Sequence, residues 1–297
     1  MMPWQELNWL EVVQTWLETQ FPKIDKLEMV HSGASAYWGI TFLEGQKLHF
    51  KAVPLRLARE VILTPWLAQF SSYTPTVLAT EPSLGWLLTK SAGETHLIHD
   101  ANVKHWHEAL RTMSELQIAT LAEHQAIQGT GCKILEPITA IAQAKAILES
   151  STDENAPRAL QNLNQIQLEG LDLLPLALAH GDFHPMNVIS PSTIIDWSDA
   201  LITHPFVDLE RFLRWIMGNS KPHHWSPFSN TRELEPIFIR AYLEPWADFA
   251  PLEKLEQVFR ATRPFGMAVL LVNARANAFA GRSLEAFYIR QLTKIIS

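Results

Sequence analysis

The chain has 297 residues, of which 47% are hydrophobic and 19% charged, an ordinary balance for a globular protein with a buried core. Its 24 basic and 31 acidic residues give a formal net charge of -7. This charge argues against broad binding to nucleic acid or to an anionic membrane, and it suits a cationic small molecule better. We therefore expect neither nucleic acid nor a membrane as a partner.

The single cysteine, Cys132, cannot form an internal disulfide, so packing must hold the fold, and a reducing cytoplasm is the expected location. The first residues show no basic region ahead of an apolar core, and the longest apolar runs are far too short to span a bilayer. We expect an unsecreted protein without a membrane anchor.

The first third of the chain predicts one helix followed by strands and a second helix. Leu7, Leu10, Val13 and Leu17 recur at helical spacing, with tryptophans that widen the apolar stripe. The strand-like runs are residues 27–32, 36–43, 47–53, 75–80 and 84–90, and the first three read as an antiparallel set.

A helical pattern over residues 55–70 contains Pro65. Proline lacks a backbone donor and its ring crowds the preceding turn, so we expect a kink or a restart there, with Thr64 as the cap.

Beyond Ser91 the pattern becomes helical. Helical stretches run from about residue 98 to 126 and from 138 to 166, with a break at 151–157, and everything past Asp196 also looks helical. The sequence predicts an α+β protein with a small strand-rich lobe, residues 1–91, ahead of a large helical lobe, residues 92–297.

The segment His180–Trp197, HGDFHPMNVISPSTIIDW, carries the residues with the clearest chemical meaning. Phosphoryl transfer needs a carboxylate that orients the attacking hydroxyl, and ligands for the metal ions that neutralise phosphate charge. Asp182 can supply the first, while Asn187 can reach a magnesium ion. A short hairpin would then return Asp196 beside Asn187 as the second metal ligand.

This segment resembles the catalytic loop and metal-binding motif of the aminoglycoside phosphotransferase and choline kinase family, which has the two-lobed protein-kinase fold. The resemblance implies that Asp182 is the catalytic base, that Asn187 and Asp196 bind Mg²⁺, and that His180 braces the loop. The downstream HPFVDLERFL is similar to a further family element, which makes Asp208 a structural acid that holds the catalytic loop. The implied activity is transfer of the γ-phosphate of ATP to a hydroxyl of a small molecule.

A kinase-like site also needs a strand lysine for the phosphates and a helix glutamate that holds the lysine. Lys51 lies in LHFKAV, and Glu60 is the only acidic residue between Glu44 and Glu81. We therefore pair Lys51 with Glu60.

Two backbone segments complete the expected nucleotide site. A phosphate-covering loop is formed by Ser32, Gly33, Ala34 and Ser35, with the amides of residues 33–35 facing the nucleotide. A hinge that binds the adenine edge is formed by Lys90, Ser91 and Ala92.

The chain departs from the family pattern at three places. The Asn187 to Asp196 hairpin is about four residues shorter than usual, but an even deletion preserves the direction of each side chain. His49 shares a strand face with Lys51 and should face the adenine pocket, where it would weaken ATP binding or change the nucleotide used. Pro65 affects the pose of the Glu60 helix.

Other interpretations stay open at this point. Asp182, Asn187 and Asp196 are also residues that close turns. The chain could be a catalytically silent kinase-like domain that binds a small molecule or a partner. His180 and His184 beside Asp182 are compatible with a metal-dependent phosphoesterase, although no Gly-Asn-His block is present.

The acceptor is not readable from the sequence. Aminoglycosides, choline-like amines, amino-alcohols, sugars and hydroxylated antibiotics are all compatible, and Asp199 or Glu210 would contribute to binding a cationic acceptor. The choice between ATP and GTP and the oligomeric state are not readable either.

Overall fold

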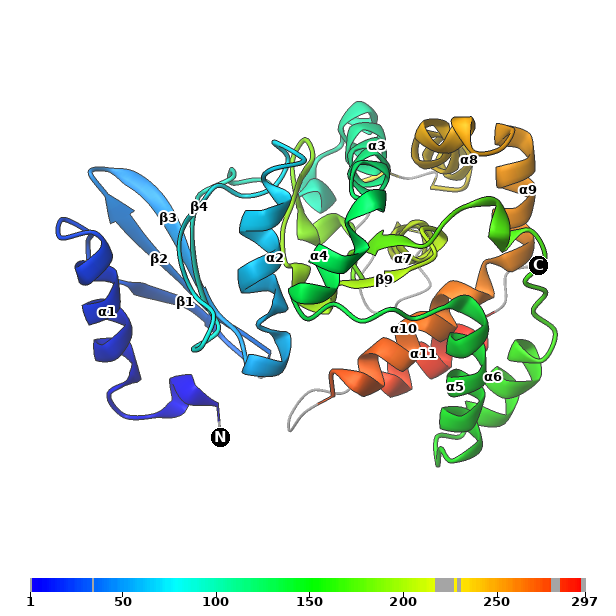
Figure 1. Cartoon of the computed structure of the whole chain (residues 1–297), viewed down its shortest axis with the longest axis horizontal. Coiled ribbons are helices and arrows are strands. Elements are labelled where there is room, and N and C mark those ends of the chain that lie inside the picture. The colour runs from blue at the N-terminus through cyan, green and yellow to red at the C-terminus, as the bar shows by residue number, and fades with distance from the viewer. Residues whose placement is uncertain (1, 34, 217–226, 229–230, 279–283, 295–297) are drawn as a thin grey trace.

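A five-stranded antiparallel sheet forms one end of the molecule and helices form the other in the computed structural model (Figure 1), which describes residues 2–33, 35–216, 227–228, 231–278 and 284–294. The strand order is β1-β2-β3-β5-β4. All five expected strands are present: β1 Glu28–Ser32, β2 Tyr37–Leu43, β3 Gln46–Ala52, β4 Val77–Glu81 and β5 Trp86–Lys90. Aromatic and aliphatic residues favour these strands. β2 alternates between buried and half-buried residues over its first five positions, whereas the first four residues of β5 are all buried.

Helix α1, Trp9–Gln20, covers one face of the sheet (Figure 1). Trp9, the first residue of α1, packs against the sheet: its ring centroid lies 4.7 Å from that of Tyr37, and the ring also contacts Phe50 and Trp86. The expectation that Leu7 and Leu10 belong to the buried stripe is wrong, since they are 101% and 46% exposed. Leu7 precedes the helix, and the face that meets the sheet is centred on Trp9 and Val13.

Helix α2, Arg59–Leu67, lies on the opposite face, between the sheet and the helical part (Figure 1). The expected restart with Thr64 as a cap is wrong, because the helix runs through Pro65. Pro65 lies in the last turn. Its missing backbone N–H therefore removes only one hydrogen bond shortly before the helix ends. Thr64 is buried in the helix rather than placed at a boundary.

The helical part contains the expected helices and two short strand pairs. Its helices are α3 Val103–Ala119, α4 His124–Gly129, α5 Pro137–Glu149, α6 Ala156–Leu163, α7 Phe206–Ile216, α8 Thr231–Leu243, α9 Leu252–Thr262, α10 Pro264–Ala276 and α11 Glu285–Leu292. The pairs are β6 Ala177–Ala179 with β9 Leu201–Thr203, and β7 Val188–Ile189 with β8 Thr193–Ile194. The expectation of helix alone past Asp196 is wrong at β9, which is too short to show a period.

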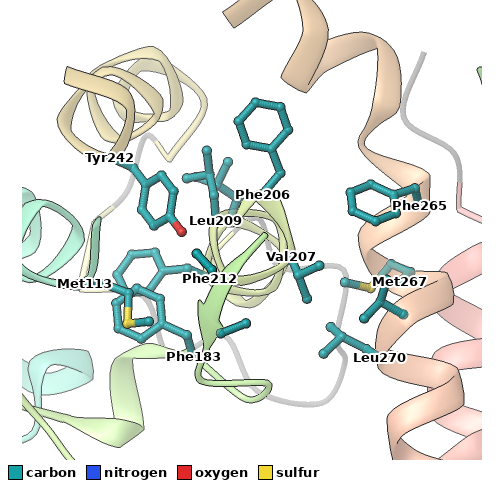
Figure 2. Close-up of a cluster of buried hydrophobic side chains, with 14 of the residues drawn as sticks. Met113, Phe183, Phe206, Val207, Leu209, Phe212, Tyr242, Phe265, Met267 and Leu270 are labelled. Atoms are coloured by element: carbon teal, nitrogen blue, oxygen red, sulfur yellow. The ribbon is translucent and has the colours of Figure 1, made fainter. Parts of the chain in front are cut away.

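Helix α7 runs through the centre of this part, and apolar side chains surround it (Figure 2). Val207 faces Met267 and Leu270 of α10, whereas Phe212 on the other side contacts Phe183. The Phe183 and Phe212 rings are stacked, with centroids 5.0 Å apart and an interplanar angle of 28°. Because Phe183 belongs to the predicted catalytic loop, the core of the helical part fixes that loop directly.

Among the described residues, no helix has the length and apolarity needed to cross a membrane.

Candidate active site

Two adjoining cavities lie where the sheet meets the helical part. The larger, of about 630 Å³, is lined by residues of both parts, among them His49, Lys51, Thr89 and Ile189. The smaller, of about 190 Å³, is lined by Lys51, Asp182, His184, Asn187, Asp196 and others. The two cavities share Lys51, Asn187 and Asp196. Residues that are far apart in sequence therefore meet at one place.

Lys51 connects the two parts of the molecule through ion pairs. Its Nζ lies 2.6 Å from Glu60 Oε2 on α2 and 2.6 Å from Asp196 Oδ1 after β8. Burial disfavours the charged lysine, but the carboxylates of Asp196 and Glu60 outweigh burial and raise the pKa of Lys51. Burial raises the pKa of Glu60 to about 7, against the effect of Lys51. A charged lysine therefore stands at the edge of both cavities.

The loop that carries Asp182 is held by its backbone. The buried carboxylate of Asp208 on α7 accepts hydrogen bonds from the amides of His180, at 2.8 Å, and Gly181, at 3.1 Å. Gln117 donates to it as well, at 3.1 Å. Gly181 has a φ of +79°, and a Cβ there would lie 2.2 Å from the carbonyl oxygen of Asp199.

The side chain of His180 braces the same loop. One ring nitrogen lies 2.9 Å from the carbonyl oxygen of Ile195, and the other accepts from the amide of Asp182 at 3.2 Å. The ring also lies 4.7 Å from that of Trp197. The imidazole therefore connects the loop to the segment that carries Asp196.

Asp182 lies at the wall of the smaller cavity, next to an arginine that the sequence analysis did not single out. Arg211 on α7 reaches Asp182 Oδ1 with Nε at 2.8 Å and Nη2 at 2.7 Å. Burial opposes ionisation, but Arg211 and His184 hold the pKa of Asp182 well below its usual range. Arg211 follows Asp208 by three residues and so shares its helix face, a signal that was available in the sequence.

The β7–β8 hairpin brings Asn187 and Asp196 to the smaller cavity. Its pairs are Val188 with Ile194 and Ile189 with Thr193. Asn187 donates its Nδ2 to the carbonyl oxygen of Asp182 at 3.0 Å, which leaves its amide oxygen for another ligand. Asp196 has a φ of +66°, a left-handed conformation that aspartate tolerates better than most residues.

Asn187 and Asp196 fit a magnesium ion, because amide and carboxylate oxygens are hard ligands. Lys51 and Ser198 both donate to Oδ1 of Asp196. Within the described ranges, no three His, Cys, Asp or Glu side chains are grouped so that they could hold a metal ion. Two protein oxygens nevertheless suit Mg²⁺, which usually keeps several waters and binds phosphate as well.

The predicted phosphate loop is only partly available to a ligand. The Gly33 amide donates to the carbonyl oxygen of Ala36 at 3.0 Å, so it is used within the turn rather than presented to the cavity. Trp4 holds the same residue, with Nε1 donating to the Gly33 carbonyl at 3.0 Å. Ser32 ends β1 opposite Tyr37, Ser35 lines the smaller cavity, and Ala34 lies outside the described residues.

The predicted hinge also keeps some of its backbone groups for the sheet. The Lys90 amide donates to the carbonyl oxygen of Thr76 at 2.9 Å, and the Ser91 amide donates to the carbonyl oxygen of Lys47 at 3.1 Å. Lys90 and Ala92 line the larger cavity. A base in that cavity would therefore not use the amides of Lys90 and Ser91.

His49 lies in the wall of the larger cavity, where its place on β3 predicted it. Its Nε2 is buried and has no hydrogen-bond partner among the residues that the structure describes. Burial lowers the pKa of His49, with a smaller contribution from Lys47, so the ring is neutral near pH 7. A neutral imidazole can present either a donor or an acceptor to a ligand.

The two acidic residues that were expected to contribute to acceptor binding lie in different places. Glu210 is fully buried and paired with Arg214 and Arg263, so the expectation that it contacts an acceptor is wrong. Asp199 does line the smaller cavity, where its Oδ1 accepts from Asn277 at 2.7 Å.

His180 and His184 offer little to a metal ion. His184 Nδ1 accepts from the amide of Met186 at 3.2 Å, and its Nε2 lies 3.3 Å from Asp182 Oδ2. Both ring nitrogens of His180 are also in contact with backbone groups. This arrangement argues against the metal-dependent phosphoesterase interpretation.

Comparison with known proteins agrees with this geometry. Residues 46–255 match the model of a family described as the phosphotransferase enzyme family, which is more than half of the chain. No curated protein sequence matches the chain.

Three solved structures share the architecture. They are choline kinase from Streptococcus pneumoniae (10% identity, 96% of this chain and 97% of that one, TM-score 0.63), ethanolamine kinase from Plasmodium vivax (13%, 97% and 88%, 0.63) and a spectinomycin phosphotransferase in complex with ADP and spectinomycin (14%, 96% and 96%, 0.56). At these identities the likeness shows the fold alone. That fold is the two-lobed kinase-like α+β fold predicted from the sequence.

Proposed function

Because the chain belongs to the phosphotransferase enzyme family, we propose that it transfers the γ-phosphate of ATP, with magnesium, to a hydroxyl group of a small molecule. One observation supports this most strongly: Lys51 from the sheet, Asp182 and Asn187 from one loop, and Asp196 from a hairpin line the same cavity. These are the residue types that phosphoryl transfer requires, in mutual reach.

Each residue has a role that its contacts support. Lys51, steadied by Glu60, binds the phosphates of the nucleotide in the larger cavity. Asp182 accepts the hydrogen bond of the acceptor hydroxyl and orients its oxygen toward the phosphorus. Asn187 and Asp196 would hold Mg²⁺, which when bound neutralises charge on the phosphates.

The shortened hairpin is compatible with activity. Although it was predicted to be about four residues shorter than in the family, its strands still bring Asn187 and Asp196 to one cavity. His180 and Asp208 then act as structural supports of the loop.

We place the division between the lobes near Ser91, directly after β5. We also propose a cytoplasmic location.

The acceptor has to be found by experiment. Choline, ethanolamine and spectinomycin are first candidates because structurally similar proteins carry these names, and aminoglycosides, amino-alcohols and sugars complete the panel. A thermal-shift screen with magnesium and a non-hydrolysable ATP analogue selects acceptors that bind.

The proposal is then tested with ATP and GTP, with and without magnesium, by acceptor-dependent release of the nucleoside diphosphate and by ³¹P NMR of the product. We expect a new phosphate monoester that forms only with magnesium. A protein that binds nucleotide but phosphorylates no compound of the panel would instead support the silent kinase-like domain.

A further inference from the structure

Both oxygens of the Asp182 carboxylate face fixed donors. Arg211 places two N–H groups on Oδ1, with Nε at 2.8 Å and Nη2 at 2.7 Å. His184 lies on the other side, with Nε2 at 3.3 Å from Oδ2. Arg211 is 6% exposed and His184 is 8% exposed, so neither donor is a loose surface side chain.

The hydrogen-bond network determines the tautomer of His184. The Met186 amide donates to Nδ1, at 3.2 Å, so Nδ1 must present a lone pair. A neutral imidazole then carries its hydrogen on Nε2. The Nε2–H group therefore points its donor toward Asp182 Oδ2.

One indole ring braces both donors. The rings of His184 and Trp215 are stacked, with centroids 4.2 Å apart and an interplanar angle of 13°. The Arg211 guanidinium carbon lies 5.2 Å from the Trp215 ring and 5.7 Å from that of Phe287 on α11. Because Arg211 and Trp215 are four residues apart on α7, the helix sets their spacing. Asp182, Arg211, Trp215 and His184 thus form a closed ring of contacts.

The two oxygens of the carboxylate differ in how closely they are engaged. Arg211 donates to Oδ1 through Nε at 2.8 Å and has Nη2 at 2.7 Å from the same oxygen, whereas His184 Nε2 lies farther from Oδ2, at 3.3 Å. An ionised carboxylate oxygen offers about two acceptor sites. Oδ2 is therefore the oxygen that keeps acceptor capacity, and the Asp182 side chain lines the smaller cavity with 21% of its surface exposed.

We propose that Arg211 and His184, braced by Trp215, are positioning residues that clamp Asp182 so that its Oδ2 receives the acceptor hydroxyl. This inference rests on the proposed function, because the hydroxyl is that of the phosphate acceptor. The clamp lets Asp182 meet the hydroxyl in one orientation without rearrangement. Misplacing a reacting group by about 1 Å can cost on the order of 10²-fold in rate.

The first test removes Arg211 and restores its guanidinium from solution. Arg211→Ala should lower kcat by about 10²-fold and leave the KM for ATP within about two-fold. Millimolar guanidinium or methylguanidinium should recover at least about ten-fold of the lost rate. The matched control is Arg260→Ala on α9, an exposed arginine that lines neither cavity, in which the same salts should have no effect. An unchanged kcat, or a loss that guanidinium does not restore in a folded variant, would overturn the proposal.

The second test uses His184 and stays decisive if Arg211→Ala does not fold. His184→Phe keeps an aromatic ring on Trp215 but removes the donor, whereas His184→Gln keeps an N–H donor without the ring. The clamp predicts that kcat falls further in the Phe variant, and that the KM for ATP is unchanged in both. Equal activity in the two variants contradicts a donor role for His184.

A third measurement does not depend on activity and separates the clamp from the proposed function. In ¹⁵N NMR spectra, the Arg211 Nε–H signal, assigned by its loss in Arg211→Lys, should exchange slowly with water in the wild type. It should exchange faster in Asp182→Asn. Fast exchange in the wild type would overturn the clamp, whereas a wild type that phosphorylates no acceptor but shows slow exchange would overturn the proposed function alone.

Discussion

The sheet and the helical part, which together line the two cavities, hold their charged groups in different ways. On the sheet side, Lys51 is held by side-chain ion pairs, one of which crosses to Asp196 in the other lobe. On the helical side, the backbone of the Asp182 loop is fixed by Asp208, and Phe183 anchors it in the core (Figure 2). Lys51 is therefore held through its side chain, whereas the loop is held through its backbone.

The largest expected effect comes from Asp182, on the helical side. Asp182→Asn keeps the shape of the side chain but removes the anion that receives the hydroxyl, so turnover should fall by roughly 10² or more. Nucleotide affinity should hardly change, because Asp208 still holds the loop. Initial rates and nucleotide titrations measure the two quantities. Full activity of this variant would refute the role of Asp182.

The next effect concerns the group that joins both sides. Asp196→Ala should abolish the magnesium dependence of nucleotide binding, which isothermal titration with and without magnesium measures. We expect an affinity loss of at least about ten-fold, since outer-shell changes alone cost that much. Ser198→Ala is the matched comparison, because it removes the 2.8 Å hydrogen bond to Asp196 Oδ1 but keeps the carboxylate; it should weaken magnesium binding and still keep the magnesium dependence. An unchanged titration for Asp196→Ala would count against Asp196 as a metal ligand.

A smaller effect should appear in the pH dependence of stability. Burial raises the pKa of Asp208 from 3.8 to about 7, despite the N–H groups of His180 and Gly181. The folded state therefore binds this proton more tightly than the unfolded state. The resulting stabilisation is complete below about pH 4 and is lost as the pH rises through about 7.

The comparison that isolates this effect is with Asp208→Asn, which does not titrate. The difference in unfolding free energy between wild type and variant, measured by urea denaturation from about pH 5 to 8, should shift against the wild type as the pH rises. Glu60, with a pKa also raised to about 7, titrates in both proteins and cancels in the difference. A difference that does not vary with pH would contradict an Asp208 pKa near 7.

The smallest effect is expected at His49, on β3 of the sheet. If its unpartnered Nε2 bonds the base, His49→Leu should weaken nucleotide binding by about five-fold, which corresponds to one hydrogen bond of about 1 kcal/mol. Binding of ATP, GTP and a purine nucleotide without a 6-substituent shows which base group is contacted. His31→Leu in the wall of the same cavity is the control. Equal affinities in wild type and His49→Leu would show that the imidazole makes no such bond.

The sequence predicted local features well, because they depend on local patterns. Short runs rich in aromatic and aliphatic residues identified the five strands, and the motif spacing placed Asn187 and Asp196 at the two ends of a hairpin. The structure brings Lys51 and Glu60 into contact, as their positions on a strand and the following helix suggested.

Features that depend on tertiary contacts were missed or assigned wrongly. The faces of Leu7 and Leu10 depend on where Trp9 meets the sheet, and the continuity of α2 depends on Pro65 lying in the last turn. Arg211 and Trp215 looked like ordinary residues of an amphipathic helix. Only the folded chain places Asp182 and His184 beside them.

The contact at Gly181 limits how this loop can be exchanged between proteins. Protein kinases carry arginine at this position of the motif. Here the backbone has a φ of +79°, and a Cβ would meet the carbonyl oxygen of Asp199 at 2.2 Å. A grafted loop that places a residue other than glycine at position 181 in this conformation would collide with residue 199, so such a graft must also carry the segment after β8.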